Sequence, residues 1–174
     1  MGRAAAVILA SLPLALWGRA IKKTVAFLEK HSSDGYTAVT GESLGLCSTP
    51  GSAMTGFMRD GTCTETNDDA GSHHICIKMK SDFCTVTGQS NWCGEEMPCH
   101  DRNNEESLTE TCPIKNWCVC QWAFASYITT AGGCDAIVDL ECSATNMAAF
   151  KAYEESSEPD HKAALECIKQ KCNL

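Results

Sequence analysis

Thirteen cysteines in a chain of 174 residues constrain this protein more than any other feature of its sequence. Their spacing is irregular and lacks the paired C-x2-C motifs that are typical of zinc sites. So high a cysteine content favours an oxidising compartment, where disulfides persist. The sequence therefore predicts up to six disulfides and one cysteine left over, and it leaves the connectivity open. The candidates are Cys47, Cys63, Cys76, Cys84, Cys93, Cys99, Cys112, Cys118, Cys120, Cys134, Cys142, Cys167 and Cys172.

The length and charge of the chain narrow the class of protein further. A chain of this length predicts one domain with a single core. The formal net charge is −8, which argues against a nucleic-acid partner because phosphate binding needs a basic face. We interpret the acidic surplus as a solvated surface.

The N-terminal segment is apolar and then amphipathic. Ala4–Trp17 is an uncharged run behind Arg3, and residues 18–31 continue it with apolar residues on one helical face. We expect a helix over residues 1–31 that is a membrane anchor, a helix embedded in a partner subunit, or a cleaved signal peptide. The run is short for a full membrane span, and Pro13 would bend it.

Residues 36–174 form the predicted globular domain, in which alternating side chains indicate strands. Ile75, Ile77 and Met79 alternate with His74, Cys76 and Lys78, which is typical of a half-buried strand. The same reasoning predicts a core strand over Trp117–Trp122 and another over Asp135–Cys142. Short helices are expected over 82–86 after a Ser81 cap, over 123–131, over 145–153, and from Pro159 onward.

These elements predict the α+β class, with a small mixed sheet, short helices and many disulfides, preceded by the N-terminal apolar helix. Gly88–Lys115 is polar and is expected to be irregular, stapled through Cys93, Cys99 and Cys112. The last helix carries Cys167 and Cys172, which we expect to pair with different elements.

Several short motifs occur together in this domain, and their order resembles a small family from bacteria, plants and algae that is known only as a domain of unknown function. The resemblance covers roughly residues 42–155. Its motifs include TGFxRDGxC, DxGxHxVC and WCLC, and it offers no established activity. The matching positions are Cys47 to Thr49, Thr55 to Cys63, Asp69, Gly71, His73, Cys76, Met79, Asp82, Phe83, Trp117 to Cys120, and Val138 to Thr145.

The chain departs from the family pattern at two places that bear on its chemistry. Asn146 stands where members usually have a histidine, and a longer cysteine-bearing loop follows Gly88. Eight cysteines are additional to the family positions, which suggests a family fold cross-linked for an oxidising compartment. The eight are Cys84, Cys93, Cys99, Cys112, Cys134, Cys142, Cys167 and Cys172.

Cysteine and histidine together also permit a metal site. Cys47, Cys63, Cys76, His73 and the Cys118/Cys120 pair have the ligand chemistry of zinc or iron. The two residues of a C-x-C strand point to the same face, so they can bind one ion or form disulfides with two neighbours. In so cysteine-rich a chain the disulfide interpretation is favoured, and no cofactor is expected.

The motif turn offers a second candidate site. Arg59 and Asp60 together with His73 could bind an anion, although an Arg-Asp step more often fixes a tight turn through hydrogen bonds to the backbone. We prefer the structural interpretation. No thiol-enzyme, hydrolase or phosphate-binding motif is present in the sequence, so no catalytic residues are assigned.

The sequence leads to the hypothesis of a non-catalytic accessory subunit of an organellar membrane complex. Residues 4–30 would contact larger subunits or lipids, and the domain would lie on the oxidising side. A thylakoid lumen or a mitochondrial intermembrane space would fit, and the algal occurrence of the family favours the former, where the complex would be photosynthetic. The alternative is a secreted or lumenal protein that binds a metal or exchanges thiols through Cys118, Cys120 and His73.

Overall fold

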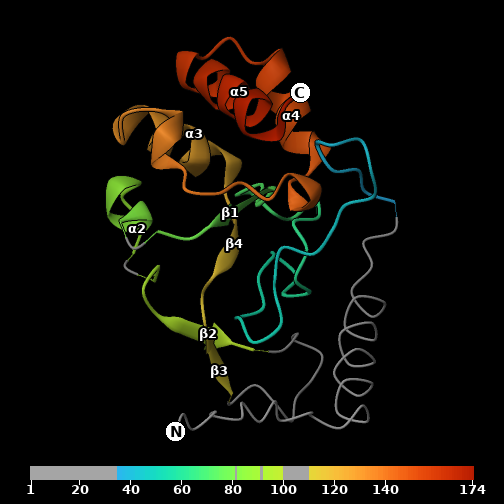
Figure 1. Cartoon of the computed structure of the whole chain (residues 1–174), viewed down its shortest axis with the longest axis vertical. Coiled ribbons are helices and arrows are strands. Elements are labelled where there is room, and N and C mark those ends of the chain that lie inside the picture. The colour runs from blue at the N-terminus through green and yellow to red at the C-terminus, as the bar shows by residue number, and fades with distance from the viewer. Residues whose placement is uncertain (1–34, 81, 91, 100–109) are drawn as a thin grey trace, which may run out of the picture. The chain divides into compact units, whose positions relative to one another are not determined.

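The structure is a computed structural model of the chain, and it describes residues 35–80, 82–90, 92–99 and 110–174 (Figure 1). The chain divides into residues 1–30 and 31–174, and all described residues belong to the second part. The helix expected over residues 1–31 lies outside the described residues, as does the Ser81 cap. Among the helices that the structure describes, none has the length and apolar character to cross a bilayer.

Two strands form the sheet at the centre of the domain. β1 (Ile75–Lys78) pairs antiparallel with β4 (Asn116–Val119), with Ile75 opposite Val119. The alternation of side chains predicted both strands, but β4 ends at Val119 rather than continuing to Trp122. The chain turns there because Cys120 is the N-cap residue of the next helix.

The two faces of this sheet pack against different groups of side chains. Ile75 and Ile77 on β1 lie in the main hydrophobic core. Cys76 between them and Cys118 opposite it on β4 lie instead in a separate buried cluster with Cys47, Cys63 and Ala144. The period-2 geometry of a strand produces this division, since successive side chains point to opposite faces.

A second small sheet lies where the sequence predicted irregular chain. β2 (Glu96–Pro98) pairs antiparallel with β3 (Thr111–Pro113). The prediction for Gly88–Lys115 was wrong in this respect because the hairpin is held by partners distant in sequence. The backbone N–H groups of Ala53 and Met54 donate to the carbonyl oxygens of Pro113 and Pro98, at 3.0 and 2.9 Å.

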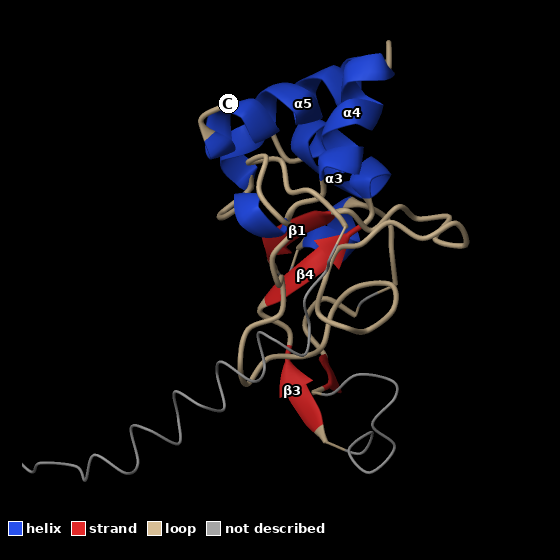
Figure 2. Ribbon diagram, turned by 90° about the vertical axis from the view of Figure 1, so that its right-hand side faces the viewer, coloured by secondary structure: helices blue, strands red, loops and turns tan. Residues whose placement is uncertain are grey.

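Four α-helices complete the described part of the fold, and three of them gather on one side of the central sheet (Figure 2). The long helix α5 packs against α3 and α4. Its first residue is proline, whose missing N–H costs nothing in the first turn. The helices are α2 (Phe83–Val86), α3 (Gln121–Thr130), α4 (Met147–Glu155) and α5 (Pro159–Cys172).

The strand predicted over Asp135–Cys142 does not form. The segment begins in the 3-10 turn η2 (Cys134–Ala136) and ends at η3 (Cys142–Ala144), and only Leu140 makes a bridge, to Ile77. Disulfides to Cys167 and Cys172 fix both ends of the segment to α5. These cross-links override the local preference for extended chain.

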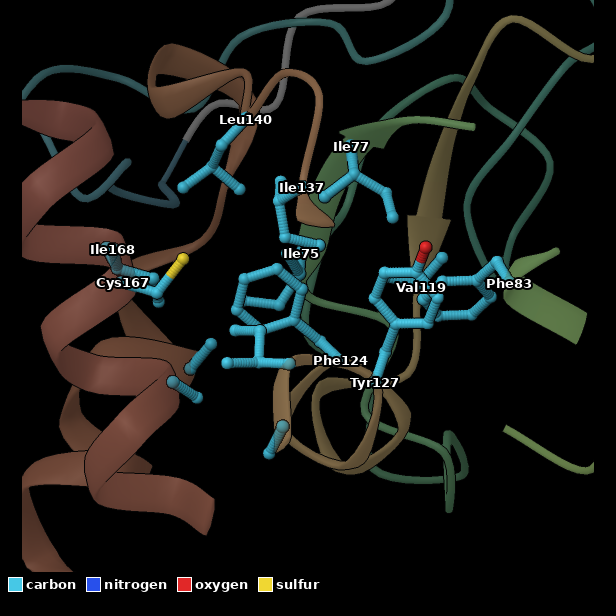
Figure 3. Packing of buried hydrophobic residues seen from close by; sticks show 14 of the residues in the cluster. Ile75, Ile77, Phe83, Val119, Phe124, Tyr127, Ile137, Leu140, Cys167 and Ile168 are labelled. Carbon is cyan, nitrogen blue, oxygen red and sulfur yellow. The ribbon is translucent and has the colours of Figure 1, made fainter. Parts of the chain in front are cut away.

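The main core lies between α3, α5 and one face of the central sheet (Figure 3). Phe124 and Tyr127 of α3 and Ile168 of α5 are each 2% exposed or less. Burial of a large apolar side chain contributes about 1.5–3 kcal/mol, so these contacts hold the helices on the sheet. The α+β class predicted from the sequence is confirmed. In place of the small mixed sheet that was expected, the described strands form two small antiparallel sheets.

Candidate functional site

Six disulfides join twelve of the thirteen cysteines. Two tie the loops before β1 to the central sheet, one ties α2 to the loop after it, one spans the β2–β3 hairpin, and two tie α5 to η2 and η3. Cys120 is the free cysteine. The pairs are Cys47–Cys76, Cys63–Cys118, Cys84–Cys93, Cys99–Cys112, Cys134–Cys167 and Cys142–Cys172.

The two disulfides on the central sheet lie side by side in the interior. The Sγ atoms of Cys47, Cys63 and Cys76 are all within 4.8 Å of one another, and the three residues are 0% exposed. Threonine hydroxyls bind the backbone beside them: the N–H groups of Cys118 and Cys76 donate to Thr55 Oγ1 and Thr145 Oγ1, at 2.8 and 3.2 Å. Each of these sulfurs is already bonded, so none is a thiolate that could bind a metal.

The alternative metal or redox set does not come together. Cys118 is bonded to Cys63, whereas Cys120 leaves the strand to begin α3. The C-x-C pair therefore does not occupy one strand face, because the second cysteine lies beyond the end of β4. Within the described residues, the only group of at least three close potential metal ligands is Cys47, Cys63 and Cys76.

Asn146, where family members usually have histidine, has a structural role here. Its side-chain oxygen accepts from the N–H of Ala148 at 2.9 Å and caps α4. Its side-chain nitrogen donates to the carbonyl oxygen of Cys63 at 3.0 Å. The amide thus joins the start of α4 to the buried disulfides, which explains why an N-cap residue suits this position.

The motif turn is fixed by the hydrogen bonds of its own polar side chains. Asp60 Oδ1 accepts from the N–H and the hydroxyl of Thr62, at 2.9 and 2.7 Å. Arg59 has a positive φ of 56° and donates from Nη1 to the carbonyl oxygen of Gly56 at 3.0 Å. The Asp60 side chain therefore stabilises the turn. Arg59 contacts the turn in the same way and also lines a pocket.

Asp69 holds His73 in one orientation. The Asp69 side chain is 1% exposed, and its Oδ1 lies 2.7 Å from His73 Nδ1. The same carboxylate accepts from the N–H groups of Gly71 and His73, at 3.2 and 2.8 Å. Burial alone would raise the pKa of Asp69, but the hydrogen bonds and charge of His73 outweigh it and hold that pKa below its ordinary value.

Replacement of Asp69 by asparagine is expected to lower the free energy of unfolding by about 2 kcal/mol at neutral pH, because charge-assisted hydrogen bonds are lost. A carboxyl with a lowered folded-state pKa contributes stability that is fully present above its unfolded-state pKa and is lost as the pH falls through the folded-state pKa. The difference between the wild type and Asp69→Asn should therefore shrink on acidification below about pH 4. Urea unfolding of both proteins as a function of pH measures this difference in the free energy of unfolding. Asp68→Asn, at an exposed position, is the control. A difference that does not change with pH would contradict the prediction.

Arg59 and His73 meet at one pocket of about 480 Å³. The guanidinium carbon of Arg59 lies 4.9 Å from the centre of the Trp117 ring, and Phe57 stacks on His73 with 6.3 Å between ring centres. Trp92 packs against Trp117 on the same wall. Gly56, Gln89, Ser90 and Met97 complete the described lining.

Sequence reasoning identified Arg59 and His73 but not the aromatic wall. Trp117 was placed on a core strand, and no periodicity or motif connects it to Trp92. The Cys84–Cys93 disulfide next to Trp92 fixes the loop that brings this side chain to the pocket. A connectivity that cannot be read from the sequence therefore helps to bring Trp92 to the site.

The hydrogen bonds of His73 show which groups this side chain contacts in the described part of the chain. The Nδ1 atom of His73 is hydrogen-bonded to Asp69. In the described part of the chain, no hydrogen bond joins His73 to a serine, threonine or cysteine side chain. A hydroxyl or thiol nucleophile activated by histidine needs such a contact. The described lining otherwise consists of aromatic, amide, hydroxyl and thioether side chains together with Arg59.

These features define the class of protein as a disulfide-cross-linked α+β domain with a small pocket lined by aromatic rings, Arg59 and His73. Residues 37–157 match the family described as an uncharacterized protein conserved in bacteria (DUF2237), and the chain belongs to that family. This confirms the resemblance that the sequence motifs indicated. No curated protein matches the chain. The described lining of the pocket lies within the matched residues, whereas α5 and its two cysteines follow them.

Proposed function

We propose that this protein is a non-catalytic accessory subunit of an organellar membrane complex, with its domain on the oxidising side. The observation that supports the proposal is that twelve of the thirteen cysteines form disulfides. These disulfides cross-link both sheets, the helices α2 and α5, and the loops before β1. Disulfides stabilise a small domain that works exposed at the edge of a larger assembly.

Residues 4–30 provide the contact with larger subunits or lipids in this proposal, because their apolar and amphipathic pattern suits a helix at a membrane. The thylakoid lumen is the favoured compartment, since the resembling family occurs in algae. The domain itself presents exposed apolar side chains, including Val138 at 55% and Trp122 at 40%, that a partner could cover.

Membrane fractionation of the source cells tests the proposal. The chain is expected in the membrane fraction after alkaline washing, to migrate with larger subunits in mild detergent, and to retain its first residues by mass spectrometry. A soluble chain that lacks residues 1–20 would overturn the proposal. A lumenal protein that the wash releases although residues 1–20 are present would contradict membrane attachment specifically.

Thiol counting and elemental analysis separate this proposal from a metal-binding or thiol-redox protein. We expect one reactive thiol, Cys120, in the denatured, unreduced chain, and no bound zinc or iron. The alternative that uses Cys118, Cys120 and His73 requires about one equivalent of metal, or a second pair of thiols that exchanges readily with glutathione. Either result would favour the metal-binding or thiol-redox protein over the accessory subunit.

A further inference from the structure

Two disulfides of the central sheet meet in one buried cluster. Cys47 is bonded to Cys76, and Cys63 is bonded to Cys118. The Sγ atom of Cys63 nevertheless lies within 4.8 Å of both Sγ atoms of the other disulfide. The four cysteines and Ala144 form a cluster separate from the main core, and each of the four is at most 1% exposed. Covalent bonding accounts for each pair, but the fold brings the two pairs together.

Each of the four cysteines is also held by a backbone hydrogen bond that does not involve sulfur. The N–H groups of Cys76 on β1 and Cys118 on β4 donate to threonine hydroxyls. The N–H of Cys47 donates to a carbonyl oxygen of the motif turn, and the carbonyl oxygen of Cys63 accepts from the N-cap amide of α4. Because these contacts do not depend on the S–S bonds, reduction leaves the four thiols gathered. The partner atoms are Thr145 Oγ1, Thr55 Oγ1, Gly61 O and Asn146 Nδ2, at 3.2, 2.8, 2.8 and 3.0 Å.

Four gathered thiols match the number and spacing of ligands in a structural zinc site. Zinc binds four thiolates as a tetrahedron with Zn–S distances of about 2.3 Å, which places the sulfurs about 3.8 Å apart. Bonded sulfurs are about 2 Å apart, so each one needs to move by only about 1 Å after reduction. Cys118 lies directly opposite Cys76 in the pairing of β4 with β1, so the fourth sulfur comes from the neighbouring strand.

We propose that the chain binds one zinc ion through Cys47, Cys63, Cys76 and Cys118 when these two disulfides are reduced. In the isolated protein an organic phosphine reduces them: each disulfide, with one phosphine and one water, gives two thiols and one phosphine oxide. Zinc then displaces the four thiol protons into the buffer, and four Zn–S bonds form where two S–S bonds stood.

This inference does not rest on the accessory role, and it agrees with a metal-free chain in an oxidising compartment. A newly synthesised chain carries thiols until it reaches such a compartment. In that state the zinc ion takes the place of the two cross-links and joins the loops before β1 to the central sheet. Oxidation to the two disulfides removes the ligands and releases the ion.

Cobalt(II) is the probe, because tetrahedral cobalt thiolates absorb visible light and zinc does not. The full chain is reduced with the phosphine without oxygen, titrated with Co²⁺ and then with Zn²⁺. We expect one equivalent of Co²⁺ to give the d–d and thiolate charge-transfer bands of a tetrahedral site, and one equivalent of Zn²⁺ to remove them. The oxidised chain should show no such bands. Zinc should also raise the unfolding temperature of the reduced chain.

Three single substitutions in the reduced chain locate the ion. Cys47→Ser is expected to weaken zinc binding about 100-fold or more, since loss of even an outer partner of a ligand costs roughly 10–100-fold. Cys84→Ser is the matched control, because Cys84 is also 0% exposed but lies outside the cluster, and it should leave the affinity unchanged. Cys120→Ser should do the same. Cys118→Ser gives a second measurement if Cys47→Ser disturbs the fold.

A reduced chain that binds no cobalt, or that stays unfolded with zinc present, would overturn the proposal. So would an unchanged affinity in Cys47→Ser, or in Cys118→Ser where the Cys47 variant does not fold. An equal loss in Cys84→Ser would assign the binding to thiols in general. An equal loss in Cys120→Ser would assign it to a site that includes Cys120, and either result would overturn the four-cysteine site.

Discussion

The double substitution Cys63→Ala/Cys118→Ala is expected to lower the free energy of unfolding by about 4 kcal/mol. The bond closes a loop with a sequence separation of 55, and the entropy that it removes from the unfolded chain grows with the logarithm of loop length. It also joins the end of the motif turn to β4, and both residues are at most 1% exposed.

Denaturant unfolding without reductant measures this loss, and Cys84→Ala/Cys93→Ala is the matched control. That pair has a separation of only 9, so the same chemical change is expected to cost about 2.5 kcal/mol. Both variants leave the other five disulfides and Cys120 unchanged. A loss in the control equal to or larger than that in Cys63→Ala/Cys118→Ala would show that loop closure is not what these bonds contribute.

Elements whose conformation is set by neighbouring residues could be predicted from the sequence. The alternation of Ile75 and Ile77 with Cys76 predicts β1 because one face of the strand is covered by α3 and α5 and the other by the disulfide cluster. Pro159 and the apolar stripe of Ala164, Leu165 and Ile168 likewise predict α5.

Elements that depend on distant partners could not be predicted. Asp135–Cys142 reads as a strand, but its ends are tied across sequence separations of 33 and 30 to α5. β2 and β3 lack a hydrophobic pattern of their own, and they are aligned by Ala53 and Met54.

The residues of the candidate site divide in the same way, into those that local motifs indicate and those that distant contacts bring together. Arg59, Asp60 and His73 lie in local motifs that mark tight turns, and reasoning from these motifs found them. The aromatic wall joins residues of separate segments, Trp92 after α2 and Trp117 on β4. The structural interpretation of Asp60 fits its bonds to Thr62, whereas Arg59 contacts both the turn and the pocket.

Gly56→Ala is expected to lower the free energy of unfolding by about 3 kcal/mol or more, the second large effect in this domain. Gly56 has a φ of +88°, which an alanine adopts at a cost of about 1 kcal/mol. A β-carbon at this position would also collide with the backbone carbonyl oxygen of Thr62 and approach Asp60 Oδ1 to 3.3 Å. The backbone cannot move aside easily, because Asp60 fixes Thr62 and Cys63 is bonded to Cys118.

Gly88→Ala separates the two causes. Gly88 also has a positive φ, of +69°, but no atom lies within 4 Å of an added β-carbon. Gly88→Ala should therefore lower the free energy of unfolding only by the conformational cost of the positive φ, about 1 kcal/mol. Thermal and urea unfolding of the two variants measure the difference, and equal losses would rule out the steric contact with Thr62 as the cause. Because Gly56 lines the pocket and accepts the hydrogen bond of Arg59, the indole signals of Trp92 and Trp117 should shift in Gly56→Ala and not in Gly88→Ala.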